Sequence, residues 1–287
     1  QVYELLHAKL QPDKMRGVEG LVSPLVGRDH ERSTLARCLQ ELNEGRGKIV
    51  KILGEAGIGK SRLLAEIRRC EGRDLTWLEG RSFAFSRALS YGPFLDLLRR
   101  HAGIADEDGE AEARASLRNR LNEIFPEEKD VYPVLAQLLS LRLEPGETAI
   151  VAAMAGEAFR SRLFAILETF LLRLAGQKPL VLVMEDLHWA DLSSVDLMAH
   201  LLSVTTRAPI AFVLLSRPRQ EAAGNWEKLE PAQRLEEFNH AFLWQVDGEY
   251  IAGRMWSSSD GKGRTHYPMV VAVHAVGVFP DDAVVIP

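Results

Sequence analysis

The chain has 287 residues, of which 46% are hydrophobic and 26% are charged, and its formal net charge is −5. This is the composition of an ordinary globular protein that can bury a core, and the negative charge gives no signal for direct nucleic-acid binding. Cys38 and Cys70 are too few for a disulfide framework and the apolar runs are shorter than a membrane span, so we expect a reducing, cytoplasmic compartment.

The first 24 residues read as a connecting segment. They begin with Gln1 and place prolines and glycines among mixed polar residues: Pro12, Gly17, Gly20 and Pro24. Prolines and glycines spread among polar residues are typical of loops and linkers. We therefore expect residues 1–24 to be a linker from an upstream domain of a longer polypeptide. A helical pattern follows, from about residue 29 to Leu42.

A phosphate-binding motif comes next. Gly54-Glu55-Ala56-Gly57-Ile58-Gly59-Lys60-Ser61 fits G-x-x-x-x-G-K-[ST]. It lies between a β-branched apolar run at 49–53 and residues 61–68, whose apolar side chains recur at helical spacing. Glycines let successive N–H groups point at phosphate oxygens, and the helix N-terminus adds partial positive charge.

This motif sets the first group of candidate binding residues. Lys60 is expected to reach the β- and γ-phosphates, and the Ser61 hydroxyl to hold Mg²⁺. The alternative is a glycine-rich turn that binds nothing, which the flanking strand and helix disfavour. The predicted nucleotide-binding residues of this segment are Gly54, Glu55, Ala56, Gly57, Ile58, Gly59, Lys60, Ser61 and Arg62.

The following 150 residues alternate between strand and helix patterns. Residues 93–175 are mostly helical in pattern, and their longest segment, 157–174, is expected to end with Gly176 as its C-cap. Another helix is expected at 193–202. Apolar strand candidates stand at 76–80, 180–184 and 210–215. Strands separated by helices predict a doubly wound α/β fold with a mainly parallel sheet.

After residue 219 the sequence pattern changes from alternating strands and helices to mostly strands. A strong hairpin signal runs from 242 to 252 around Asp247-Gly248, and 269–276 is apolar and rich in β-branched residues. We expect residues 225–287 to form a separate, small, β-rich (α+β) module.

Two acids follow the apolar run at 180–184, where a parallel strand would end. Glu185 is assigned to the metal side and Asp186 to the catalytic base, although the reverse order is an open alternative. Acids that simply mark a turn are the plainer interpretation, which the phosphate-binding motif disfavours.

Three more polar residues are candidates near these strand ends. Arg217 follows the strand at 210–215 and could stabilise a γ-phosphate, or equally be a surface arginine. His188 and Asp191 suggest a metal site only weakly, because a third ligand is missing. We favour a structural role for them in the loop after the acids.

The segments Leu25–Asp29, Gly54–Leu64 and Val183–Asp191 together resemble the STAND branch of AAA+-type ATPases, and more narrowly the Orc1-like ATPase modules found behind class III adenylate/guanylate cyclase domains. The resemblance covers about residues 1–219. It implies a P-loop NTPase three-layer sandwich over residues 25–219, with ATP and Mg²⁺ as ligands. It further implies that Val26 and Arg28 line the adenine side, that Arg217 is a sensor residue, and that nucleotide turnover toggles a signalling switch.

The chain departs from this pattern at its C-terminal end. Such ATPases continue into a helical lid or winged-helix domain, whereas residues 253–270 are similar to TagF-like proteins associated with type VI secretion. A missing lid removes contacts that would close the nucleotide site, so we expect nucleotide binding more firmly than turnover.

The sequence therefore predicts an ATP-binding, Mg²⁺-dependent NTPase module acting as a regulatory switch in a larger bacterial signalling protein. Its expected partners are ATP and other domains of that polypeptide or a separate protein, with homo-oligomerisation and GTP preference left open. The alternative is a non-catalytic nucleotide-binding adaptor whose β-rich tail binds a secretion or signalling partner. A small-molecule kinase is disfavoured by the paired acids.

Overall fold

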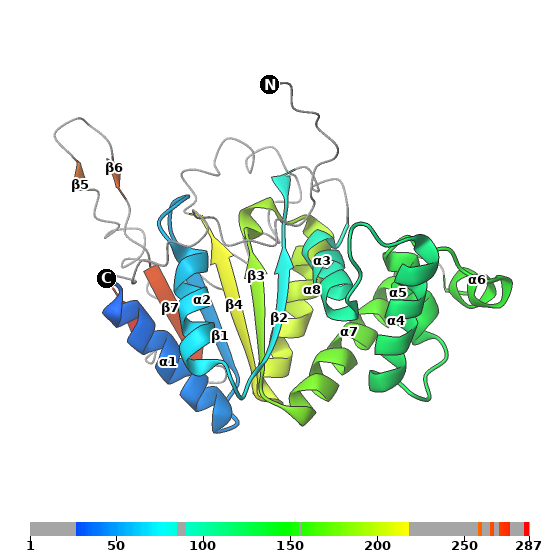
Figure 1. The fold of residues 1–287 in the computed structure, drawn as a ribbon, viewed down its shortest axis with the longest axis horizontal. Helices are drawn as coiled ribbons and strands as arrows, with labels where there is room; N and C mark the ends of the chain where they lie inside the picture. Colours follow the sequence, from blue (N-terminus) through cyan, green and yellow to red (C-terminus); the bar gives the residue numbers. More distant parts are fainter. Residues whose placement is uncertain are drawn as a thin grey trace.

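The computed structural model describes residues 27–84, 90–154 and 156–217, together with the backbone of four short strands farther along the chain. The described helices and strands are arranged with a run of α-helices between the second and third strands, and with a single α-helix between the first and second strands and between the third and fourth (Figure 1). In chain order they are α1 (Asp29–Asn43), β1 (Lys48–Leu53), α2 (Lys60–Glu71), β2 (Thr76–Arg81), α3 (Gly92–Ala102), α4 (Glu110–Ile124), α5 (Val131–Leu138), α6 (Pro145–Ala152), α7 (Glu157–Gln177), β3 (Leu180–Glu185), the 3₁₀ turn η2 (Leu187–Trp189), α8 (Leu192–Leu202), the 3₁₀ turn η3 (Ser203–Thr206), β4 (Ile210–Ser216), β5 (Ser258–Ser259), β6 (Thr265–His266), β7 (Val270–Ala275) and β8 (Val284–Ile286).

The main sheet has six strands in the order β2-β3-β4-β1-β7-β8. The first four of these strands are mutually parallel, whereas β7 pairs antiparallel with β1 and β8 antiparallel with β7. Strand β7 therefore extends the sheet beyond the strand that precedes the phosphate-binding motif. Strands β5 and β6 form a separate antiparallel pair.

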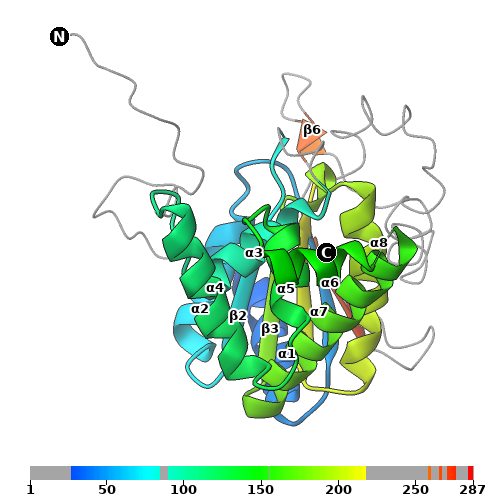
Figure 2. The same cartoon turned by 90° about the vertical axis from the view of Figure 1, so that its right-hand side faces the viewer.

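Helices cover both faces of the sheet, as Figure 1 and the rotated view in Figure 2 show. Alternate residues of each strand point to opposite faces. On β3, for example, Val181 and Val183 belong to a core shared with α1 and α2, whereas Leu182 and Met184 belong to the larger core on the other face. The predicted three-layer α/β sandwich with a mainly parallel sheet is confirmed.

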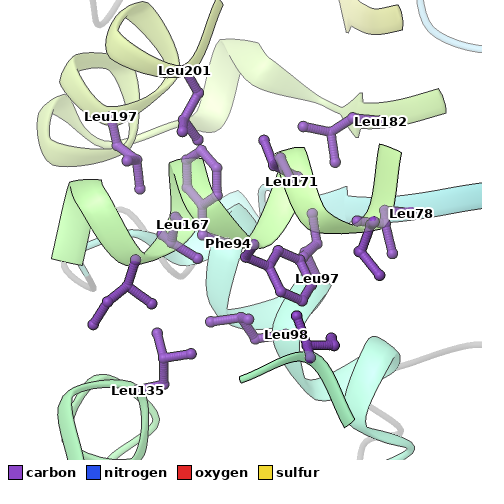
Figure 3. Close-up of a cluster of buried hydrophobic side chains, with 14 of the residues drawn as sticks. Leu78, Phe94, Leu97, Leu98, Leu135, Leu167, Leu171, Leu182, Leu197 and Leu201 are labelled. Carbon is purple, nitrogen blue, oxygen red and sulfur yellow. The ribbon is translucent and has the colours of Figure 1, made fainter. Parts of the chain in front are cut away.

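The larger core packs α3, α7 and α8 against the sheet. Figure 3 shows leucine and phenylalanine side chains from these helices converging with side chains of α5, β2 and β3. Those labelled in the figure are Leu78, Phe94, Leu97, Leu98, Leu135, Leu167, Leu171, Leu182, Leu197 and Leu201. All ten are buried, so hydrophobic burial sets how α3 and α8 stand against the sheet.

Strand β2 lies very close to α3. At Gly80, the Cβ of any other residue would lie 2.2 Å from the carbonyl oxygen of Pro93. A side chain at this position would push α3 away from the strand, so the glycine permits the close approach.

One predicted helix end is wrong. Gly176 lies inside α7, which continues to Gln177 and has Lys178 as its C-cap. Pro179 explains the difference, because a residue before proline is pushed out of the helical region. Lys178 accordingly has an extended backbone, with φ −154° and ψ 143°.

The predicted linker at 1–24 and the predicted hairpin at 242–252 fall outside the described residues. The division into a linker, a domain at 25–219 and a module at 225–287 stays a prediction. Among the described helices, none combines the length and apolar character needed to cross a membrane.

Candidate functional site

The carboxyl ends of the four parallel strands lie at one edge of the sheet. Strand pairing places Leu53 of β1 beside Ser216 of β4, and Glu185 of β3 beside Arg81 of β2. Strand β4 stands between β1 and β3, so the loop after β1 and the acids after β3 are two strand spacings apart, about 10 Å. The phosphate-binding motif and the paired acids therefore share one edge.

The loop from Gly54 to Gly59 depends on glycine at two positions. Gly57 has φ +78° and Gly59 has φ +101°, a region that residues with a Cβ rarely adopt. Gly59 is also the N-cap of α2, so the turn delivers the chain directly into the helix. The N–H of Gly54 donates to the carbonyl of Ser216 at 3.3 Å, which ties the start of the loop to the end of β4.

Lys60 reaches back over this loop. Its Nζ donates to the carbonyl oxygens of Gly54 at 2.6 Å and of Glu55 at 3.0 Å, and the side chain is partly buried. Ser61 and Arg62, in the first turn of α2, are exposed. A cation over a glycine loop at a helix N-terminus, with a hydroxyl next to it, fits a phosphate chain and its Mg²⁺.

The two acids are held by an arginine that the sequence analysis missed. Arg81 Nη2 lies 2.5 Å from Glu185 Oε2, and Arg81 Nε lies 3.5 Å from Asp186 Oδ2. Glu185 is the last residue of β3, whereas Asp186 follows it with a left-handed backbone, φ +55°. One guanidinium thus faces both carboxylates at the edge of the sheet.

Arg81 is itself positioned from α3. Its backbone N–H donates to Asp96 Oδ2 at 2.9 Å, and Arg100 Nε donates to the same oxygen at 2.9 Å. Burial raises the pKa of the Asp96 carboxyl, an effect that the charges of Arg100 and Arg81 oppose. No local motif marks Arg81 or Asp96, because their roles depend on β2 lying next to β3.

The loop after the acids contains His188 and Asp191. His188 is buried, with its ring centroid 5.0 Å from that of Trp189. Asp191 is the N-cap of α8, and its carboxylate accepts from the backbone N–H of Ser194. Within the described residues, no group of three His, Cys, Asp or Glu side chains is arranged to hold a metal ion. The hydrogen bonds of Asp191 agree with the expected structural role in this loop.

Two of the remaining predicted site residues, Arg28 and Arg217, lie near the ends of the described range 27–217. Arg28 precedes α1, and its Nη1 donates to Glu31 Oε1 at 2.7 Å. Arg217 directly follows β4, at the same edge as the motif and the acids. Val26 falls outside the described residues. The adenine contacts of Val26 and Arg28 and the sensor role of Arg217 stay predictions.

Comparison with known proteins agrees with this geometry. Residues 24–213 match the model of the AAA ATPase domain. The chain is also similar to the uncharacterized protein R02095 of Rhizobium meliloti (strain 1021), with 30% identity over 223 residues. That alignment covers 76% of this chain and 21% of the relative, so the chain spans about a fifth of the relative's length.

Proposed function

The chain belongs to the AAA ATPase domain family, and we propose that it is a Mg²⁺-dependent NTPase module that binds ATP and acts as a STAND-type regulatory switch in a larger bacterial signalling protein. The observation that carries the proposal is the shared sheet edge. The glycine loop follows β1, the paired acids stand at the end of β3, and only β4 stands between the two strands.

Each residue at this sheet edge has its own proposed role in ATP binding or hydrolysis. The loop N–H groups and Lys60 bind the phosphates, because they supply fixed donors and a cation at a helix N-terminus. Ser61 and Glu185 hold Mg²⁺, which supplies charge neutralisation on the phosphates when bound. Asp186 orients and deprotonates the attacking water, and Arg217 stabilises the γ-phosphate charge from the end of β4.

The switch role rests on the resemblance to STAND ATPases and on the arrangement of the helices. Helices α4 to α7 follow α3 in the chain. Asp96 of α3 accepts a hydrogen bond from the backbone N–H of Arg81, the residue at the end of β2 whose guanidinium contacts the acids. A conformational change caused by ATP binding or hydrolysis is therefore transmitted through Arg81 and α3 to the surface of helices α4 to α7. Other domains of a longer polypeptide, or a separate protein, are the proposed readers of that surface.

Nucleotide titrations on matched variants test the proposal. Wild type should bind ATP at millimolar Mg²⁺. Lys60→Ala should abolish binding, and Asp186→Ala should bind ATP yet release no phosphate above background. Lys129→Ala is the control, because Lys129 is an exposed lysine outside the site. A wild-type protein that binds neither ATP nor GTP would refute the proposal.

One observation favours a second candidate, a non-catalytic nucleotide-binding adaptor. Arg81 pairs with Glu185 and lies near Asp186, so its guanidinium occupies the carboxylates that would have to hold Mg²⁺ and orient the water. In this alternative the nucleotide stabilises the fold and the β-rich tail binds a secretion or signalling partner. Phosphate release by wild type that disappears in Asp186→Ala excludes it.

A further inference from the structure

Asp191 joins the beginnings of two helices. Its Oδ1 accepts the backbone N–H of Tyr91 at 3.1 Å and that of Ser194 at 2.9 Å. Its Oδ2 accepts the N–H of Gly92 at 3.2 Å and the hydroxyl of Ser194. Tyr91 and Gly92 begin α3, and Ser194 lies in the first turn of α8. A carboxylate between two helix N-termini is favoured by both helix dipoles.

These bonds close a ring of contacts around the acids. From Asp191 the ring passes to the start of α3, and Asp96 on α3 accepts the backbone N–H of Arg81. The Arg81 guanidinium contacts the carboxylates of Glu185 and Asp186. The short chain through η2 then leads from Asp186 back to Asp191. We call this closed path the α3 ring.

The α3 ring rests on a packed support. Phe94 of α3 lies in the same buried cluster as Leu197 and Leu201 of α8, and all three are labelled in Figure 3. Tyr91 has a left-handed backbone, φ +66°, a conformation that costs free energy unless other contacts hold it. The two N–H bonds to Asp191 at this helix start are such contacts.

We infer that Asp191 is a positioning residue, which sets Glu185 and Asp186 relative to the phosphate-binding loop by holding α3 and the acid loop together. The inference rests on the proposed function. Without the charge and the second carboxylate oxygen of Asp191, the N–H of Gly92 and the hydroxyl of Ser194 lose their acceptor, and the link between the two helix starts is weakened. The acid loop can then shift relative to β2, while the glycine loop and Lys60, which belong to β1 and α2, keep their place.

The test compares a variant at the N-cap of α8 with a variant within that helix. Asp191→Asn keeps the shape of the side chain but removes its charge and one acceptor. Asp196→Asn is the control, because Asp196 lies within α8 and pairs with Arg160 of α7, at 3.1 Å and outside the ring. The measurements are ATP affinity in EDTA, the Mg²⁺ concentration that gives half of its effect on ATP binding, and kcat with KM.

Asp191→Asn should keep its metal-free ATP affinity within about twofold of wild type, because the phosphate-binding loop is untouched. Its Mg²⁺ requirement should rise at least about fivefold and its kcat should fall about 10- to 100-fold at unchanged KM, as expected for displaced catalytic groups. Asp196→Asn should match wild type in all three. Equal Mg²⁺ requirement and kcat in the two variants would overturn the inference.

Two further outcomes are decided by the same set of measurements. If Asp191→Asn fails to fold, Ser194→Ala replaces it, since this variant removes only the hydroxyl bond to Asp191. A smaller rise of the Mg²⁺ requirement in Ser194→Ala supports the inference, and no change overturns it. A wild type that binds no nucleotide refutes the proposed function itself, whereas Mg²⁺-dependent binding that Asp191→Asn leaves unaltered refutes only the role of Asp191.

Discussion

Lys51 is a buried lysine in the strand that leads to the phosphate-binding loop. It lies on β1, where it pairs with Leu214 of β4 and Ala272 of β7, and only 6% of its surface is exposed. Burial lowers the pKa of its amine from 10.5 to about 8, because desolvation disfavours the charged form. Holding the protonated amine in the fold at neutral pH therefore costs stability.

The size and pH dependence of this cost follow from the pKa difference. A fall from 10.5 to about 8 corresponds to about 3 kcal/mol at 1.36 kcal/mol per pKa unit. Below pH 8 both folded and unfolded states carry the proton and the full penalty applies. Between about pH 8 and 10.5 the unfolded state binds more protons, so the free energy of unfolding rises with pH.

Replacing Lys51 by methionine removes this titration at similar volume. At pH about 7, Lys51→Met should be more stable than wild type by as much as about 3 kcal/mol. The difference should shrink as the pH approaches about 10, because the wild-type amine then loses its proton in the fold.

Urea unfolding of both proteins across this pH range gives the difference directly, since other titrating groups are common to both. Lys129→Met, at an exposed position, should match wild type at every pH. A stability difference between Lys51→Met and wild type that is independent of pH would refute the assignment of the cost to a buried charge.

Other substitutions probe the glycines. Gly59→Ala should lower ATP affinity more than tenfold and stability by about 1–2 kcal/mol, because φ +101° strains a residue with a Cβ; Ala56→Gly, in the same loop, should change affinity less than about threefold in the same titration. Gly80→Ala should lower the melting temperature, since its Cβ would meet the Pro93 carbonyl at 2.2 Å. Gly176→Ala should raise stability by up to about 1 kcal/mol, because that helical position is open; a loss there would contradict the helix assignment.

Local sequence patterns were sufficient to predict most of the α/β framework. The apolar runs that became β3 and β4 are hydrophobic at every position but the last, as expected for strands covered on both faces. The surroundings of the phosphate-binding motif could also be predicted, because the residues next to it have the patterns of a strand before it and a helix after it. Gly176 does not end α7, because Pro179 forces Lys178 out of the helical region and so fixes the end of the helix.

The surroundings of the acids could not be predicted in the same way. Arg81 and Asp96 are ordinary residues of a strand end and a helix, and they become site residues only because β2 pairs with β3 and α3 packs on β2. Strand order is a long-range property that no window of sequence contains. The antiparallel pairing of β7 with β1 could not be predicted either, because an apolar β-branched run indicates a strand but not the strand with which it pairs.

The backbone at the end of β3 gives a physical reason for the order of the two acids. Glu185 still has strand geometry and lies in register with Arg81, which suits a long side chain that reaches along the sheet edge. Asp186 has φ +55°, and aspartate tolerates this left-handed conformation better than glutamate because its short side chain can bond locally. The left-handed residue also turns the chain out of the strand and into η2, toward Asp191. Exchanging the two acids would put the less tolerant residue at the turn and shorten the side chain that meets Arg81. The order Glu-Asp is therefore set by the turn that starts the acid loop as well as by the chemistry proposed for it.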